Sequence, residues 1–261
     1  MNSVHDPRVF RQRLLAREPL IGSFLKFPVP HATEIFGTAG FDFVMLDEEH
    51  APWTRDTLDT GFLAARAFGV AGLVRIARPD ANSILSALDD GASGIMVPHV
   101  ATAEKARQIA SWARYKGGTR GAGLGRGGDY GVRFGDAHYD YADEVTTVVA
   151  MIEDREAIER IDEITAVHGI HAFFIGRGDL ALSLSNAEGP APTLTEAVGI
   201  IAESVLRNGK ALSAVVQDME SDDARAMIDL GVSAMMVGSD HGFLRNAALD
   251  QRGKFERMMK G

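Results

Sequence analysis

Charged and imidazole side chains follow directly on several apolar runs of this chain. The run at residues 41–46, FDFVML, is followed by Asp47, Glu48, Glu49 and His50. An imidazole oriented by a carboxylate transfers protons near neutral pH, and neighbouring carboxylate oxygens are the ligands that Mg²⁺ and Mn²⁺ prefer. These residue types therefore indicate acid–base chemistry beside a divalent cation.

Most of the other apolar runs also end in polar residues. They are Arg75, His99, Glu153 with Asp154, Asp179, Gln217 with Asp218, and Ser239 with Asp240. Asp154, Asp218 and Asp240 are expected to be caps of the helices that follow, and His99 is expected to be structural. Charges that leave water need partners, so acids, an arginine and histidines that converge on one face indicate a site.

Eight β-prone runs recur at regular intervals and must position these residues. They lie at 21–27, 41–46, 71–77, 94–100, 148–152, 172–176, 211–216 and 234–238. The segments between them have apolar residues at three- and four-residue spacing, which is typical of amphipathic helices. The strands are continuously apolar, as expected for a parallel sheet that helices cover on both faces.

Eight alternations of strand and helix in 261 residues predict an α/β protein with one (β/α)₈ barrel domain over 1–261. A doubly wound open sheet is the structural rival, but no nucleotide fingerprint follows the first strand. The active site of such a barrel lies at the carboxyl ends of its strands. The polar residues at the strand ends are therefore expected to meet there.

Glu153 and Asp179 are the candidate metal ligands. Residues two apart share a face of a strand, so Glu153 is expected at the mouth of the barrel with Met151 beneath it. Asp179 follows the next strand, and two carboxylates at one rim suit a hard divalent cation. The alternative is a structural ion network in which both acids pair with Arg75 and Arg177.

Composition limits the partners. Lys and Arg number 27 against 36 Asp and Glu, a net charge of −9, and no segment carries a basic stripe, so we expect no nucleic-acid partner. No signal peptide or uncharged run of membrane-spanning length is present, which predicts a cytoplasmic protein with no membrane partner. The chain has no cysteine, which excludes disulfides, thiolate ligands and a cysteine nucleophile.

The segment at about 116–144 interrupts the rhythm of strands and helices. It is rich in glycine and contains GAGLGRGG, but the match to a phosphate loop is weak, because such loops follow a strand and open a helix. We expect a long loop that folds over the mouth of the barrel. The alternative is a flexible surface excursion.

Six motifs then resemble a known family. LDEEHAP, the arginine of LVRIARPD, LDDGASGIMVP, RYKGGTRGAG, MIED and FIGRGDLA stand in the order of the signatures of the HpcH/HpaI class II pyruvate aldolases. The resemblance covers about residues 21–245 and includes 4-hydroxy-2-oxoheptanedioate and 2-dehydro-3-deoxyglucarate aldolases. It implies a TIM barrel of the phosphoenolpyruvate/pyruvate type. It also implies a hexamer, a trimer of dimers, in which a C-terminal helix at about 242–259 packs against a neighbouring subunit.

The resemblance also implies roles for the polar residues. Glu153 and Asp179 would ligate the divalent metal, which is Mg²⁺, Mn²⁺ or Co²⁺. Arg75 would contact the keto and enolate oxygen of the substrate, and His50 with Asp47 would form the acid–base pair.

Three further positions match family motifs. The backbone amides of Gly178 and Asp179 would cradle the carboxylate of pyruvate. Asp89, in LDDG, would lie near the histidine, within the subunit or across a subunit boundary. Glu49 would hold metal-bound water beside the substrate.

The chemistry also follows from the residues themselves. Carbanion formation next to the carbonyl of pyruvate requires positive charge at the enolate oxygen, which a metal and an arginine supply. A lysine Schiff base is the other route to an enolate, and Lys26 is the candidate for it. The pair of carboxylates favours the metal route.

The chain departs from the family pattern at four positions. Glu48 stands where glycine is usual, Met151 where glutamine is usual, and Phe24 where many members have tryptophan. Arg177 precedes Gly178 in place of a Gly-Pro turn. It is expected either to bind an anionic group on the aldehyde or to pair with Glu48.

We therefore predict a metal-dependent aldolase that forms or cleaves 4-hydroxy-2-oxoacids. Its small-molecule substrates would be pyruvate, or a 2-oxoacid like hydroxypyruvate, and an aldehyde. An acyl-CoA lyase of the malyl or citramalyl type is one alternative, but it needs a basic CoA groove that the sequence does not reveal. A barrel that binds 2-oxoacids without catalysis is the other, and Glu48 and Met151 favour it.

Overall fold

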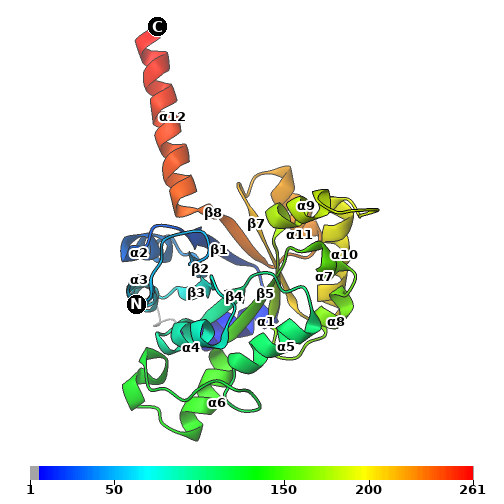
Figure 1. Cartoon of the computed structure of the whole chain (residues 1–261). Coiled ribbons are helices and arrows are strands. Elements are labelled where there is room, and N and C mark those ends of the chain that lie inside the picture. The colour runs from blue at the N-terminus through cyan, green and yellow to red at the C-terminus, as the bar shows by residue number, and fades with distance from the viewer. Residues whose placement is uncertain (1–5, 261) are drawn as a thin grey trace.

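Eight parallel strands close into a barrel in the computed structural model, which describes residues 6–260 (Figure 1). The strands are β1 Leu20–Leu25, β2 Phe43–Asp47, β3 Ala71–Arg75, β4 Gly94–Val97, β5 Thr147–Ile152, β6 Ala172–Ile175, β7 Ala211–Val216 and β8 Ala234–Ser239. Each strand coincides with a predicted run, and the (β/α)₈ prediction is confirmed. The first and fourth strands end earlier than predicted, so Lys26 and His99 lie just beyond them.

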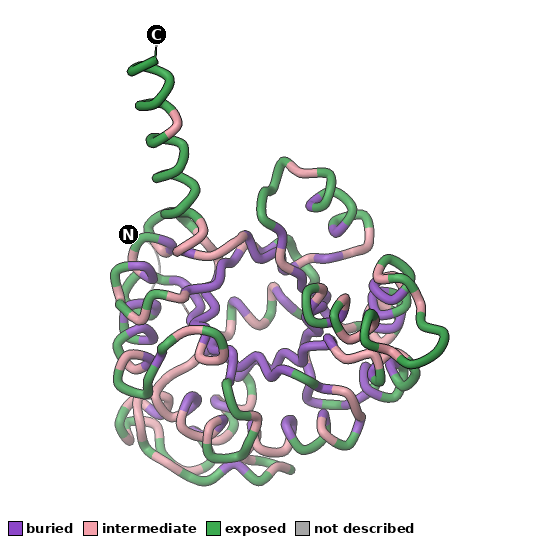
Figure 2. Tube along the Cα trace, turned by 45° about the horizontal axis from the view of Figure 1, so that its top comes forward, coloured by how far each residue is buried: buried purple, intermediate pink, exposed green. Residues whose placement is uncertain are grey.

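Helices surround the barrel (Figure 2). They are α1 Pro7–Leu15, α2 Pro30–Thr38, α3 Arg55–Phe68, α4 Ala81–Asp89, α5 Ala103–Trp112, α6 Asp136–Val145, α7 Arg155–Ile158, α8 Ile161–Thr165, α9 Arg177–Ser185, α10 Leu194–Arg207, α11 Asp222–Asp229 and α12 Asp240–Lys260. Local sequence sets their ends. Thr54 begins α3 with a capping box to Thr57, and Gly69 ends it at a φ of 71°, a conformation that glycine adopts without steric cost.

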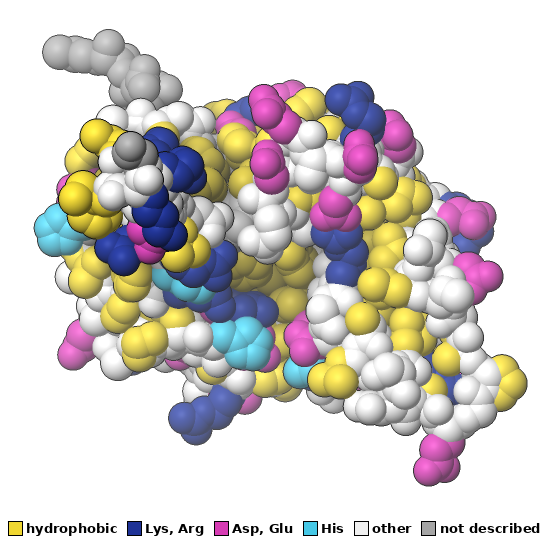
Figure 3. Space-filling view, turned by 90° about the horizontal axis from the view of Figure 1, so that it is seen from above, with side chains coloured by type: hydrophobic (Ala, Val, Ile, Leu, Met, Phe, Trp, Pro, Cys, Tyr) yellow, Lys and Arg dark blue, Asp and Glu magenta, His cyan; other side chains and the backbone are white. Residues whose placement is uncertain are grey.

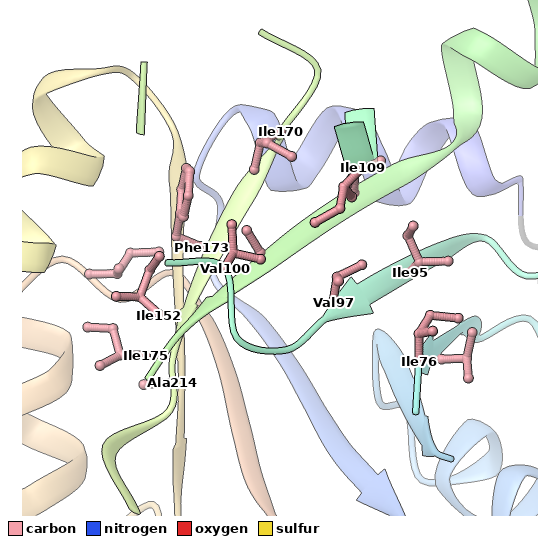
Figure 4. Close-up of a cluster of buried hydrophobic side chains, with 14 of the residues drawn as sticks. Ile76, Ile95, Val97, Val100, Ile109, Ile152, Ile170, Phe173, Ile175 and Ala214 are labelled. Carbon is pink, nitrogen blue, oxygen red and sulfur yellow. The ribbon is translucent and has the colours of Figure 1, made fainter. Parts of the chain in front are cut away.

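The strands separate two apolar cores. Side chains such as Ile95, Ile152 and Ile175 point outward and pack under the helices (Figure 4). Alternate residues point inward, so that Met151 lies in the barrel interior with Met96. Since both faces of each strand are buried, the strands have to be apolar throughout.

Helix α1 closes the amino-terminal end of the barrel. Phe10 and Leu14 project from it into the interior cluster, and the ring of Phe10 lies 5.6 Å from that of Phe43. The apolar interior is thereby shielded from water at this end. The carboxyl ends of the strands are left as the open mouth.

The glycine-rich segment at 116–144 does not cover the mouth of its own barrel, and that prediction is wrong. It contains a 3₁₀ helix, η1 at Arg126–Gly131, and most of α6, which pack against α4 and α1. In a (β/α)₈ barrel, a connection from a helix to the next strand lies at the amino-terminal end of the barrel. The segment follows α5 and precedes β5, so it lies at that end. Its glycines allow a close approach to α4, because a Cβ at Gly123 would lie 2.5 Å from an Asp89 oxygen.

Helix α12 projects from the barrel at the end of β8 (Figure 1). Asp240 is its one buried residue within the described part of the helix. Between residues 6 and 260, no helix has both the length and the apolar character needed to cross a bilayer. The cytoplasmic location stays a prediction.

Candidate active site

The mouth of the barrel is a hollow ringed by charged side chains. Viewed from above, hydrophobic side chains form its floor, and Lys or Arg, acidic and histidine side chains lie around it (Figure 3). The residues that follow the strands supply this ring, as the sequence predicts. Their contacts decide what each one can do.

Asp47 and Arg75 form a buried ion pair at the ends of neighbouring strands. They are directly opposite in the parallel register of β2 and β3. Arg75 donates from Nε to Asp47 Oδ1 at 2.8 Å and from Nη2 to Oδ2 at 2.7 Å, which fixes the plane of the guanidinium. The ring of Phe24 lies 4.8 Å from the guanidinium carbon and adds a cation–π contact.

Lys26 is a second cation on Asp47. Its Nζ lies 2.7 Å from Asp47 Oδ2. Burial alone would raise the pKa of Asp47, but the hydrogen bonds and charges of Arg75 and Lys26 outweigh it and lower that pKa. The Lys26 amine is thus bound to a buried carboxylate, which does not suit a Schiff-base nucleophile.

The expected side-chain pair of His50 and Asp47 is not formed within the chain. From His50, Asp47 accepts the backbone N–H at 3.2 Å and no bond from the imidazole, because Arg75 and Lys26 occupy its carboxylate. The imidazole is 54% exposed and lies 3.8 Å from Glu49 Oε2. His50 therefore stands at the mouth free to accept another partner.

Glu49 lies between the cationic and acidic sides of the mouth. Its Oε2 is 3.2 Å from Arg75 Nη1. Its negative charge also acts on Glu153, whose pKa it helps to raise. The position is compatible with the expected role beside metal-bound water, which stays a prediction.

Glu153 is buried just beyond β5. Its Oε1 accepts the backbone N–H of His99 at 2.8 Å. A Cβ at residue 176 would lie 2.6 Å from Oε2, so Gly176 gives that oxygen its room. Burial raises the pKa of Glu153, and the charges of Glu49 and Asp179 add to this effect against the hydrogen bond from His99.

Asp179 lies in the first turn of α9 and is exposed. Its carboxylate makes no hydrogen bond or ion pair to any other residue in the described part of the chain. The first backbone bond here runs from Leu180 N–H to Gly176 O at 2.9 Å. The amides of Gly178 and Asp179 precede it, at a helix N-terminus that favours an anion.

The acidic side of the mouth fits a hard divalent cation. Glu153 keeps one carboxylate oxygen clear of the His99 hydrogen bond, and Asp179 is unpaired among the described residues. Burial raises the pKa of Glu153, the charges of Glu49 and Asp179 add to the effect, and a bound cation would oppose it. Across residues 6–260, no group of three or more metal-ligating side chains is assembled, so water and substrate would complete the coordination.

The departures from the family pattern have structural explanations. Glu48 Oε2 accepts the backbone N–H of Ala77 at 3.1 Å and holds the loop after β3. Arg177 pairs with Asp223 at 2.5 and 2.8 Å and donates to Val215 O at 2.6 Å. The expected pair of Arg177 with Glu48 is therefore not formed, and the alternative role as an anion site stays a prediction.

Asp89 lies at the other end of the barrel. It ends α4, and its Oδ1 accepts from Arg120 Nη2 at 2.9 Å. A place beside His50 within the same chain is therefore wrong. The alternative that sequence left open, a contact across a subunit boundary, stays a prediction.

Two residues of the mouth have larger roles than the sequence suggested. The sequence indicates Lys26 only as a candidate nucleophile, whereas in the structure its Nζ pairs with Asp47. His99 has a left-handed backbone with φ 55°, and its Nδ1 lies 3.0 Å from Asp154 Oδ1, so Asp154 is tied to His99 and makes no side-chain cap bond. In the sequence, the one indication of these roles is that Lys26 and His99 each follow the end of a strand.

Comparisons with known proteins place the chain among aldolases. The family model described as HpcH/HpaI aldolase/citrate lyase matches residues 20–247. A hydroxypyruvate/pyruvate aldolase of Delftia acidovorans is 35% identical over 94% of this chain and 91% of its own length. A 5-keto-4-deoxy-D-glucarate aldolase of Klebsiella pneumoniae is 31% identical over 95% and 96%. A solved structure of a family protein from Burkholderia cenocepacia has a TM-score of 0.87 and 25% identity, over 95% of this chain and 99% of that one.

The Asp47 ion pairs give a testable effect on stability. Asp47→Asn removes a charge that two cations need, and we expect the free energy of unfolding at pH 7 to fall by about 3–5 kcal/mol. The folded-state pKa of Asp47 is lowered, so its contribution is complete above the unfolded value of about 3.9 and is lost at lower pH. The deficit measured by urea unfolding should therefore be constant from pH 7 to 5 and shrink toward pH 3.

Asp229→Asn is the matched control, because Asp229 is exposed on α11. It should change stability by less than about 0.5 kcal/mol. A deficit for Asp47→Asn that stays the same down to pH 3 would contradict the electrostatic explanation.

Proposed function

Since the chain belongs to the HpcH/HpaI aldolase/citrate lyase family, we propose that this aldolase forms and cleaves 4-hydroxy-2-oxoacids through a pyruvate or hydroxypyruvate enolate and an aldehyde. One observation carries the proposal. The mouth holds a fixed guanidinium, Arg75, on one side and two carboxylates on the other. Glu153 keeps one oxygen clear of the hydrogen bond from His99, and Asp179 has no side-chain partner among the described residues. An enolate between a bound cation and Arg75 would have positive charge on both sides.

Arg75 supplies preorganised charge to the enolate oxygen. Asp47 and Phe24 fix its guanidinium before substrate arrives. Donors that need no reorganisation at the moment of reaction stabilise developing negative charge most effectively. Asp47 thus acts on the reaction by positioning Arg75.

Glu153 and Asp179 would hold the divalent metal, Mg²⁺, Mn²⁺ or Co²⁺. The metal, when bound, acts as a Lewis acid that withdraws electron density from the carbonyl of the 2-oxoacid. The amides of Gly178 and Asp179, at the start of α9, bind the substrate carboxylate, as helix N-termini bind anions.

His50 transfers the proton. Its imidazole is 54% exposed at the mouth, within reach of substrate and solvent. Because Asp47 is committed to Arg75 and Lys26, the carboxylate that orients His50 comes from elsewhere. Asp89 of a neighbouring copy is our candidate, since Asp89 lies far from His50 in its own barrel.

The alternative of a barrel that binds 2-oxoacids without catalysis loses its main support, which was the departures at Glu48 and Met151. Glu48 bonds to the backbone of Ala77, so its charge is directed to a loop. Met151 is buried in the barrel interior and occupies the floor below Glu153. The groups required for enolate chemistry are all retained at the mouth.

The hexamer predicted from the family is part of the proposal, with α12 as an interface. Five large apolar side chains of this helix are 54–83% exposed: Leu244, Leu249, Phe255, Met258 and Met259. Apolar area of this extent on a projecting helix is typical of an interface. A second copy of the chain would cover it.

Exchange of the pyruvate methyl protons tests the proposed reaction. In D₂O with Mn²⁺ or Mg²⁺, we expect the protein to replace the methyl protons of pyruvate with deuterium, observed by NMR. His50→Ala should slow the exchange by about 10²–10⁴-fold and still bind metal. The aldolase proposal is wrong if wild-type protein shows no exchange with Mn²⁺, Mg²⁺ or Co²⁺.

Metal retention tests the two carboxylates separately. We expect Asp179→Ala to abolish Mn²⁺ binding in calorimetry, because it leaves one protein ligand. Asp222→Ala is the control, since Asp222 is also an exposed acid in the first turn of a helix, and it should bind Mn²⁺ like wild type. Equal Mn²⁺ affinity of Asp179→Ala and wild type would refute the ligand assignment.

The state of assembly tests the role of α12. Wild-type protein should have several times the 28.1 kDa mass of one chain in light scattering, and Leu244→Glu should lower that mass by placing a charge on the apolar stripe. Asn246→Glu adds the same charge to the opposite side of the helix and should leave the mass unchanged. A monomeric wild type would contradict the interface.

A further inference from the structure

A second cavity lies at the amino-terminal end of the barrel, opposite the catalytic mouth. Its volume is about 280 Å³, and the starts of β5, β6 and β7 adjoin it. Three cationic residues line it: Arg11 from α1, Arg114 after α5, and Lys210 before β7. His168 and His171 lie on the same wall.

The cavity has an excess of positive charge. Asp143 is the one acid among its lining residues within the described chain, against the three cations. Both oxygens of Asp143 already accept backbone N–H groups, from Tyr115 at 2.8 Å and Lys116 at 2.9 Å. The carboxylate is therefore not placed to neutralise all three cations.

Arg114 leaves its donors unused. Its Nε is buried and without a hydrogen-bond partner in the described structure, and its side chain forms no ion pair with another described residue. Buried donors are normally satisfied, so the guanidinium of Arg114 is open to an acceptor that enters the cavity. The neighbouring Arg11 donates to a carbonyl, Asp143 O at 2.5 Å, and its Nη2 lies 2.8 Å from His171 Nε2.

The two cations nearest the interior are only partly compensated. Burial lowers the pKa of Arg11 and the charge of Arg114 lowers it further, and together they outweigh the opposite effect of Asp143 and Glu144. Burial also lowers the pKa of Lys210, whose Nζ donates to the carbonyls of Val167 and Ile170 at 3.3 and 2.8 Å. Carbonyl oxygens satisfy hydrogen-bond donors but carry no full negative charge, so the excess of positive charge in the cavity remains.

His171 cannot add to or share this charge. Burial and the surrounding cations lower its pKa to about 3, so its imidazole is neutral at physiological pH. Its Nδ1 accepts the backbone N–H of Val148 at 2.9 Å. The wall of the cavity is thus a fixed polar surface, and the three cations decide its electrostatics.

We propose that this cavity binds a small dianionic oxyanion, a phosphate group or a dicarboxylate, between Arg11, Arg114 and Lys210. Guanidinium groups match such oxygens in geometry and charge. The anion would join α1, the end of α5 and the start of β7. It would therefore fasten the helix that closes the barrel, at a site separate from the chemistry.

Thermal unfolding in inorganic phosphate and in malonate, at ionic strength matched with sodium chloride, tests the site. We expect at least one of the two anions to raise the melting temperature in a saturable manner, while chloride does not. Arg114→Gln should weaken that binding at least tenfold in calorimetry. In chloride alone this variant should melt no lower than wild type, because it removes a cation that nothing pairs with.

Arg225→Gln is the matched control, since Arg225 is exposed on α11 and outside the cavity. It should bind the anion as wild type does. The inference is overturned if neither anion binds, or if Arg114→Gln binds with wild-type affinity. It is also overturned if Arg75→Lys, at the mouth, abolishes binding while Arg114→Gln does not.

Discussion

The carboxylate of Asp47, fully buried where β2 ends, is the constraint on which the mouth of this barrel depends. It cannot remain ionised without cations, and Arg75 and Lys26 provide them from the strands on either side. The three side chains therefore fix one another. The same contacts that satisfy a buried charge also fix the orientation of the Arg75 guanidinium beside Glu49 as the chain folds.

The barrel directs polar chemistry to one end. Its interior is filled by apolar side chains such as Met96 and Met151, and α1 closes the other end with Phe10 and Leu14. Charges can be placed only where the strands stop and water returns. On the acidic side of the mouth, burial raises the pKa of Glu153, and the charges of Glu49 and Asp179 add to this effect.

The amino-terminal end has a different electrostatic character. There, cations gather in a cavity that has too few acids, whereas the mouth combines cations with an excess of acids. Asp89 also lies at that end, paired with Arg120. A homo-oligomer that brings this end of one copy to the mouth of another would give His50 a carboxylate in addition to Glu49 of its own chain.

The sequence by itself determined the strands, the barrel and the ring of polar strand ends, because each depends on periodicity within one short segment. It also predicted that Arg75, Glu153 and Asp179 lie at the carboxyl end of the barrel, because each stands at or just after the end of a parallel strand. The partners of those residues were decided by the tertiary structure. Asp47 pairs with Arg75 and Lys26 through strand register, Arg177 with Asp223 through helix packing, and the segment at 116–144 lies at the closed end. Such contacts join residues far apart in the chain, and the nearest charge in space is not the nearest one in sequence.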